Sequence, residues 1–312
     1  MARSGSYNYS LDRDQIIKLA MQRANIININ QTARGADHAY AVDIFQGMIK
    51  LWQAEGIQLW NRRQATLFTA YQDEQYSISN TGDHCTNSYL NTTLSAAAAS
   101  GATSFTVTSA TGMAASDNIG IELDGKSRQW TTISSIAATT ITVATALTGA
   151  AASGNTVVTY TSKISDRPLR ILNARSIDLN NSKNSIPMEL IGYDEYFNIP
   201  IKTTDGRQLN YYYDKLLDAG VLYLFPRPDD VDILVDFTYH EALEDVDSST
   251  NNVDFPTEWT LPIIACLSAE LALAFGKFQE YTVLEAKAQE YKEIVRQFDN
   301  DDAPLFVLPY FL

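Results

Sequence analysis

The histidines and cysteines of this chain are few and scattered, which limits the chemistry they could perform. His38, His84 and His240 form neither a His-x-x-x-His nor a His-Glu-x-x-His spacing, the patterns that place two metal ligands on one helix face. With only Cys85 and Cys266 present, a disulfide framework and a cysteine-based zinc site are both excluded by number. The adjacent residues His84 and Cys85 would need distant partners to bind a metal. We therefore expect no metal and no cofactor.

Paired carboxylates are the remaining candidates for catalysis. Glycoside hydrolysis needs two carboxyl groups at a defined separation. Aspartates cluster at Asp12/Asp14, Asp229/Asp230, Asp245/Asp247 and Asp299/Asp301/Asp302. Such clusters are common in turns and at helix starts, and the one beginning at Asp245 lacks the glycine and final glutamate of a standard calcium loop. Because the sequence also contains no phosphate-binding loop and no Gly-x-Ser-x-Gly elbow, we predict that the protein is not an enzyme.

Composition sets the class of protein. The chain has 312 residues, of which 45% are hydrophobic, so it is long enough for two domains and can bury a core. Its net charge of −14 argues against a surface that grips nucleic acid, since phosphate binding needs clustered lysine and arginine. An acidic wall would instead let DNA pass without sticking. The N-terminus lacks the apolar core of a signal peptide. The most hydrophobic window of the chain is 259–276, but Pro262 and Glu270 interrupt it. This window therefore predicts a buried helix and no membrane span.

Helices are predicted at both ends of the chain. Asp12 and Gln15 have the spacing of a capping box and predict a helix over 12–25. A second helix is expected over 36–55, with Gly56 as the residue that ends it. Near the C-terminus, two apolar stripes predict core-facing helices on either side of a break at Gly276; they comprise Ile264, Leu267, Leu271 and Phe275, and Leu284, Ala288, Tyr291, Val295 and Phe298.

Strands are predicted between the helical ends. Residues 231–239 alternate between apolar and polar types, the pattern of a half-buried strand. The apolar run 221–225 precedes it, and the turn-forming residues 226–230 between them predict a β-hairpin. Residues 209–215 contain three consecutive tyrosines and predict another strand. These tyrosines could form a sugar-binding platform, although an interface or a sheet face is the favoured interpretation.

The middle of the chain, residues 93–163, differs sharply in composition and repeats itself. It is rich in Ala, Thr, Ser and Gly and poor in charge. The segment 102–107 matches 138–143, and each copy closes with an Asn and a β-type run, at 118–123 and 155–160. Alternating apolar residues argue against a low-complexity linker and for a small inserted all-β domain. Such an insert could bind a partner or fill space between neighbouring molecules.

The C-terminal segment combines apolar side chains with two prolines. Proline cannot continue a helix or donate to a central sheet ladder, so these residues predict an extended arm that begins at about residue 300 and docks on another surface. Folding back onto the protein's own core is the alternative. The candidate docking residues are Pro304, Leu305, Phe306, Val307, Leu308, Pro309, Tyr310, Phe311 and Leu312.

Several short motifs, taken in order, resemble one protein family. They lie at 49–60, 65–68, 75–76, 167–171, 192–196, 220–228 and 254–259. Their order across residues 1–92 and 163–312 is similar to that of the head-to-tail adaptor proteins of short-tailed double-stranded DNA bacteriophages, also called tail accessory or head-completion proteins. The segment 93–163 departs from the simplest members of that family.

The resemblance implies a structural virion protein at the portal–tail junction, assembled in the bacterial cytoplasm. Such adaptors form a twelve-fold ring that connects the portal of the filled capsid to a tail nozzle or tail-tube protein. Their C-terminal arms pack against the portal, and DNA passes through without specific binding. The expected fold is α+β, with an adaptor core of residues 1–92 and 164–312, β-hairpins, and the β insert at 93–163. Two alternatives remain: a module whose insert contacts host glycan or another virion protein, and a tail-associated polysaccharide hydrolase.

Overall fold

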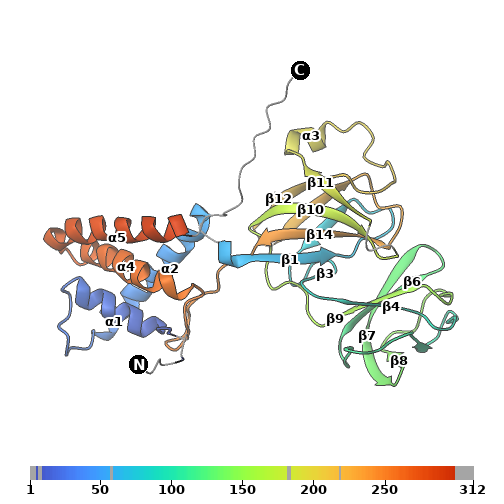
Figure 1. Cartoon of the computed structure of the whole chain (residues 1–312), viewed down its shortest axis with the longest axis horizontal. Helices are drawn as coiled ribbons and strands as arrows, with labels where there is room; N and C mark the ends of the chain where they lie inside the picture. Colours follow the sequence, from blue (N-terminus) through green and yellow to red (C-terminus); the bar gives the residue numbers. More distant parts are fainter. Residues whose placement is uncertain (1–4, 6–8, 57–58, 181–183, 218, 299–312) are drawn as a thin grey trace. The chain divides into compact units, whose positions relative to one another are not determined.

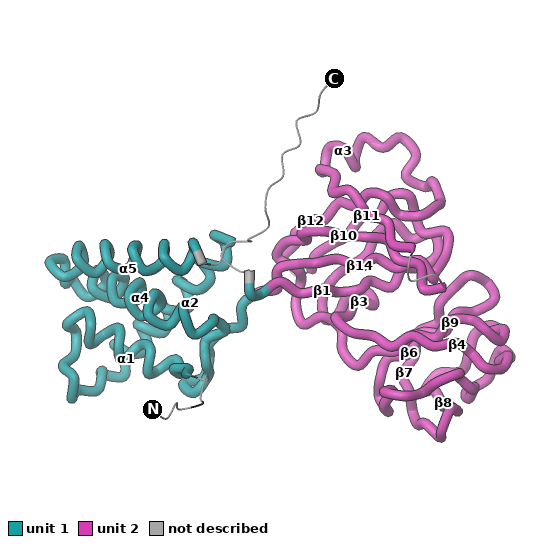
Figure 2. The backbone as a smooth tube through the Cα atoms, viewed as in Figure 1, with its two compact units in different colours: residues 1–61, 243–312 teal, residues 62–242 magenta. Residues whose placement is uncertain are grey.

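The computed structural model describes residues 5, 9–56, 59–180, 184–217 and 219–298. The fold is mixed α+β: helices from the two chain ends pack together, and the middle of the chain forms an eight-stranded near-barrel and a six-stranded antiparallel half-barrel (Figure 1). The chain divides into two compact units (Figure 2). We call residues 1–61 with 243–312 the helical unit and residues 62–242 the β unit.

The helical unit has helices in the regions where the sequence predicts them, and the first two begin and end within two residues of the predicted bounds. Its helices are α1 (Arg13–Arg23), α2 (Gly35–Glu55), α4 (Thr260–Ala274) and α5 (Phe278–Phe298). The Asp12 side chain accepts a hydrogen bond from the Gln15 amide at 2.8 Å, and Gln15 accepts one from the Asp12 amide, which confirms the capping box. Gly56 ends α2 with φ +77°, and Gly276 separates α4 from α5 with φ +71°.

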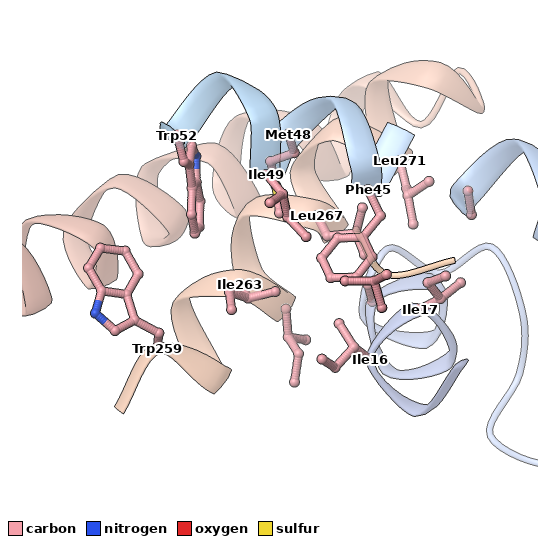
Figure 3. Close-up of a cluster of buried hydrophobic side chains, with 14 of the residues drawn as sticks. Ile16, Ile17, Phe45, Met48, Ile49, Trp52, Trp259, Ile263, Leu267 and Leu271 are labelled. Carbon is pink, nitrogen blue, oxygen red and sulfur yellow. The ribbon is translucent and has the colours of Figure 1, made fainter. Parts of the chain in front are cut away.

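The core of the helical unit forms around α4. Figure 3 shows side chains of α4 and of the turn before it meeting those of α1 and α2; the labelled members are Ile16, Ile17, Phe45, Met48, Ile49, Trp52, Trp259, Ile263, Leu267 and Leu271. Residues 257–274 are the one stretch of the described chain that is long and apolar enough to cross a membrane, and 61% of that stretch is buried in the protein. The core of this unit accounts for the apolar character of this stretch, which comprises the turn before α4 and α4 itself.

The eight-stranded sheet takes strands from both sides of the half-barrel segment. In spatial order it consists of β2 (Gln75–Ile78), β13 (Gly220–Phe225), β12 (Asn210–Lys215), β11 (Ser185–Leu190), β10 (Arg170–Asp178), β14 (Ile233–His240), β1 (Arg62–Leu67) and β3 (Cys85–Thr86). Strand alternation buries Tyr211 and Tyr213 and turns Tyr212 to the other face, beside the short helix α3 (Tyr193–Phe197). A compact turn over 79–84 connects the edge strands β2 and β3.

The predicted hairpin between residues 221–225 and 231–239 is wrong. Both strands exist as β13 and β14, but β13 pairs with β12 and β2, and β14 pairs with β10 and β1. The hairpin in this region is formed by β12 and β13, with Tyr212 opposite Tyr223. A strand has only two hydrogen-bonding edges, and partners distant in the sequence occupy both edges of β14. The turn-forming residues 226–230 therefore mark a chain reversal between strands that do not pair.

The half-barrel lies between β3 and β10 in the sequence and has a core of its own. In spatial order it consists of β4 (Leu90–Thr93), β9 (Thr156–Tyr160), β6 (Asn118–Leu123), β7 (Ser127–Ala137), β8 (Thr140–Val143) and β5 (Ser104–Thr106). Aliphatic side chains and Phe105 fill its interior. The edge strands β4 and β5 approach each other through a bridge between Leu94 and Val107, so the sheet curls toward closure.

The sequence repeat becomes an approximate two-fold relation within the half-barrel. The matching segments pair with each other: β5 lies antiparallel to β8, with Phe105 opposite Ile141, and β6 lies antiparallel to β9. The remaining strands follow the same relation, because β4 pairs with β9 as β7 pairs with β6. Each copy contributes three strands, and neither copy closes a core without the other.

Candidate interaction surfaces

The three histidines have separate structural surroundings. In the helical unit, His38 Nε2 lies 3.4 Å from an Asp14 carboxylate oxygen. In the β unit, His84 stacks on Trp130, whereas His240 ends β14, where burial and nearby arginines lower its pKa. Across the described ranges, no three His, Cys, Asp or Glu side chains gather where they could hold a metal ion.

The aspartate clusters have structural partners where the structure describes them. Asp14 pairs with Arg13 at 3.0 Å, and Asp245 pairs with Lys50 at 2.5 Å. Asp230 accepts a hydrogen bond from the Asp232 amide, and Asp247 accepts one from the Asn251 side chain. Asp299, Asp301 and Asp302 lie outside the described residues. Asp14, Asp230 and Asp247 thus contact residues up to four positions away, whereas Asp245 pairs with a lysine of α2.

An aromatic seam joins the two sheets of the β unit. Phe68 follows β1 and contacts the rings of Tyr89, Trp130 and Tyr160 at centroid separations of 5.1 to 5.9 Å. His84 lies flat against Trp130 at 3.8 Å, and its Nδ1 is 2.5 Å from the Tyr160 hydroxyl. Burial, together with the charge of Lys163, lowers the pKa of His84 to about 4. His84 is therefore neutral at neutral pH and has a packing role here.

A buried ion pair lies in the same seam. Arg128 from β7 contacts Asp232, which precedes β14, at 2.6 Å, and the two side chains are only 1% and 4% exposed. Arg128 also donates to the Val231 carbonyl and to Thr156, while Asn180 donates to the second Asp232 oxygen. Burial lowers the pKa of Arg128, although the Asp232 charge opposes that shift. Removal of either charge would leave the other buried without a partner.

The packing of β6 against the seam explains why residue 120 is a glycine. A Cβ atom at Gly120 would lie 2.8 Å from the Trp130 ring and 2.9 Å from Arg128 Cδ, closer than such contacts permit. Trp130 and Arg128 therefore lie across the backbone of β6 where only glycine leaves room. No motif or spacing in the sequence indicates this seam. Arg128 carries one of the few charges in the 93–163 segment, and that rarity is the signal that could have drawn attention to it.

The helices of the helical unit leave large apolar side chains in solvent. They are Tyr40 and Leu51 on α2, Leu261 and Leu273 on α4, and Phe278, Val283 and Ile294 on α5. Val283 and Ile294 are 66% and 57% exposed and are separated by about three helical turns, so they share one face of α5. A cavity of about 360 Å³ beside Leu51 lies between α2, α4 and α5. We call the seven exposed side chains on α2, α4 and α5 the exposed helix residues.

A second exposed surface surrounds α3 in the β unit. Tyr193 and Phe197 are 59% and 64% exposed, and their rings stack at 6.1 Å. Tyr212 and Tyr223 from the hairpin of β12 and β13 stack beneath α3 at 5.7 Å, and Tyr196 fastens the helix to them. The three consecutive tyrosines of β12 thus pack within the β unit: two rings lie in the core of the sheet, and the third lies against α3. Exposed aromatic rings of this kind are enriched at protein interfaces.

The predicted docking arm cannot be placed. Residues 299–312, which include all nine candidates from Pro304 to Leu312, lie outside the described residues. Helix α5 ends at Phe298, immediately before this segment. The arm therefore stays a prediction.

Comparison with known proteins leaves the family open. No protein-family model matches the chain, and no curated protein is significantly similar to it in sequence.

Proposed function

We propose that this protein is a structural virion protein that forms a ring between the portal of the filled capsid and the tail of a short-tailed bacteriophage. The support comes from the order of the short motifs that resemble the adaptor family and from one structural observation. The helical unit completes its core around α4, yet it leaves the exposed helix residues on α2, α4 and α5 in solvent. Where such exposed apolar side chains lie together in one patch, that patch is typical of a surface that a second protein molecule covers.

In a ring, the exposed helix residues would lie in the contacts between neighbouring subunits. In a closed ring each subunit contacts two neighbours through different faces, so a subunit needs two complementary surfaces. Leu51 borders the cavity between α2, α4 and α5, and Val283 and Ile294 project from α5. We assign these helices to contacts between subunits and Pro304–Leu312 to docking on the portal. An arm that orders on binding loses affinity but permits assembly to be timed.

The remaining parts of the proposal concern the channel and the tail. A net charge of −14 suits a wall that DNA traverses without specific binding. The aromatic surface around α3 and the half-barrel are assigned to the outside of the ring or to the tail nozzle or tail-tube protein. The proposal gives the protein no enzymatic role and no membrane contact.

Native mass spectrometry tests the ring. The purified chain is measured alone and after mixing with the portal ring of the same phage. The expected result is one discrete mass step that corresponds to a full ring of added subunits, twelve for a twelve-fold ring. A chain that stays monomeric and does not associate with the portal would contradict the proposal.

Two variants separate the arm from the helices. Deletion of residues 303–312 is expected to abolish portal binding while the helical content measured by circular dichroism stays unchanged. The triple variant Leu51→Glu, Val283→Glu and Ile294→Glu is expected to fold but to leave the ring incomplete. Leu217→Glu is the matched control, because Leu217 is 88% exposed and lies in the β unit. Portal binding that survives the arm deletion would overturn the role of the arm.

A further inference from the structure

The cavity beside Leu51 is a groove between α2 and α5, with α4 beneath it. It has a volume of about 360 Å³, and α4 packs against both of the helices that form its sides. Residues 285–292 of α5 contribute one side, which is mostly polar. All of the residues that line the groove belong to the helical unit, so it is a feature of that unit alone.

The α2 side of the groove is apolar and open to solvent. Ile44, Gly47 and Leu51 all line it, and their spacing of three and four residues places them on one face of α2. Leu51 is 61% exposed, Gly47 is exposed and Ile44 is half-buried. Lys292 of α5 pairs with Glu55 of α2 at 2.7 Å, which ties the two sides together. The groove therefore offers apolar contacts that a molecule from outside can reach.

Gly47 is a glycine that the described residues do not explain. It lies in the interior of α2, where glycine is less favourable than alanine. Its φ is not positive, and a Cβ atom built on it would meet no atom within 4 Å. Neither the backbone conformation nor the packing of the described residues therefore requires glycine here. A glycine that leaves such space is typical of a place where another backbone segment approaches closely.

The segment that follows α5 is long enough to reach the groove. Helix α5 ends at Phe298, and its residues 285–292, which line the groove, lie about 9–20 Å back along the helix axis. The sequence continues from 299 to 312, and these 14 residues span up to about 46 Å when extended. Residues 299–302 leave room for a turn, so residues 303–312 can lie along the groove.

The composition of this segment suits the groove. Residues 303–312 carry leucine, valine and aromatic side chains, and Pro304 and Pro309 favour an extended chain over a helix. An extended backbone can pass close to Gly47 and set its apolar side chains against Ile44 and Leu51. A segment of the same chain is also present at a high effective concentration, which a second copy in dilute solution lacks.

We propose that residues 303–312 dock in the groove between α2 and α5 of their own chain before the protein assembles. The consequence for assembly rests on the proposed function. The docked arm covers Leu51, one of the exposed helix residues, until the portal binds the arm. Release of the arm then uncovers the groove for a neighbouring subunit, so that contacts between subunits form only at the portal.

Protection of a thiol in the groove tests the docking. Leu51→Cys is alkylated with iodoacetamide, and peptide mass mapping separates the introduced thiol from Cys85 and Cys266. We expect the introduced thiol to react at least about tenfold more slowly in the full chain than in a chain that lacks residues 303–312. Leu273→Cys is the matched control, because Leu273 is 44% exposed on α4 but does not line the groove. Equal rates for Leu51→Cys with and without the arm overturn the proposal.

Substitution of Gly47 shows whether the arm lies in this groove. Gly47→Leu fills the open space, so adding it to Leu51→Cys should restore fast alkylation in the full chain. The melting temperature should not fall, because leucine favours a helix more than glycine does. Gly35→Leu is the matched control: a Cβ atom at Gly35 of α2 also meets no atom within 4 Å, but Gly35 does not line the groove. Protection that survives Gly47→Leu would place the arm elsewhere and overturn the proposal.

Dilution distinguishes the chain's own arm from that of a second copy. Protection within one chain should persist at nanomolar protein concentration, whereas loss of protection on dilution would contradict docking within the chain. These measurements use the chain without the portal. Portal binding can therefore fail while protection persists, and protection can be absent while the portal still binds the chain.

Discussion

The helical unit and the β unit differ in the charged groups that they bury. The helical unit has a core of aliphatic, phenylalanine and tryptophan side chains, and it leaves large apolar groups exposed on its helices. The β unit instead encloses aromatic rings and an ion pair, Arg128 with Asp232, where its two sheets meet. The apolar surface of the helical unit suits contact with other molecules, whereas the seam of the β unit fixes one sheet on the other. The difference predicts that substitutions in the two units act on different properties.

The largest effect is expected from Arg128→Ala. The change leaves the Asp232 charge buried without its partner, so the free energy of unfolding of the β unit should fall by about 3–5 kcal/mol. Hydrogen exchange should accelerate in β6, β7 and β9 and stay slow in α4. Lys287→Ala, which removes an exposed ion pair with Glu290, is the control and should leave the free energy of unfolding almost unchanged, because solvent screens exposed ion pairs. Equal acceleration in α4 would show that the two units do not unfold separately.

A comparable change in the helical unit is Trp259→Ala. Trp259 is 2% exposed and packs against Trp52 and Phe255, so its truncation should cost about 3 kcal/mol. Here α4 should lose protection from exchange while β14 keeps it. Leu261→Ala is the control two residues away, at the start of α4, because Leu261 is 49% exposed. A chemical denaturation midpoint that does not move would contradict the assignment of Trp259 to the core.

Acid should weaken the β unit through His84. Its pKa is about 4 in the folded protein and about 6.5 when unfolded, so between these values the unfolded state binds more protons. The free energy of unfolding should therefore be highest above pH 7 and fall as the pH drops from about 6.5 to about 4. Solvent reaches part of the His84 ring and screens its charge, so the loss is smaller than the full pKa difference implies. We expect a loss of about 2 kcal/mol in the free energy of unfolding.

Denaturation curves between pH 4 and 7 measure this dependence, with His84→Gln as the comparison. Burial also lowers the pKa of His240, which acts in the same direction, so the variant should keep a shallower slope. A slope unchanged by His84→Gln would show that His84 does not titrate between these pH values.

The smallest effect is expected at the start of α1. Asp12→Ala removes the side-chain cap and should lower the stability of the helical unit by about 1 kcal/mol. Arg34→Ala is the matched control at the start of α2, because the Arg34 side chain makes no capping hydrogen bond. The β unit should respond to neither change. If both variants lowered the stability of the helical unit equally, the capping box would not be the cause of the loss in Asp12→Ala.

Local signals in the sequence predicted local structure well. The capping box at Asp12 and the left-handed Gly56 depend on residues within a few positions of each other, so composition and spacing are sufficient. The hairpin prediction was wrong for the opposite reason. The strands at 221–225 and 231–239 were recognised from alternation, which is local, but their partners lie up to 178 residues away, as for Arg62 and His240. Alternation shows that a strand has a buried face and does not identify the strand beside it.

The candidate sites divide in the same way. Sequence predicted a docking arm at Pro304–Leu312 from apolar and proline content, and that prediction is untested, since these residues lie outside the described ranges. It gave no indication of the ion pair between Arg128 and Asp232. These two residues lie 104 positions apart, and no spacing rule relates them. Only the fold of the half-barrel against the eight-stranded sheet brings them together.

By itself, then, the sequence determined the α+β class, the positions and ends of the first helices, the internal repeat and the acidic charge. These properties follow from side-chain type, periodicity and capping, which act within one or two turns of the chain. Tertiary structure decided which strands pair, that the two repeat copies complete one half-barrel, and that Arg128 and Asp232 meet in a buried seam. Those outcomes depend on long-range pairing and burial, where the free energy comes from groups distant in the sequence.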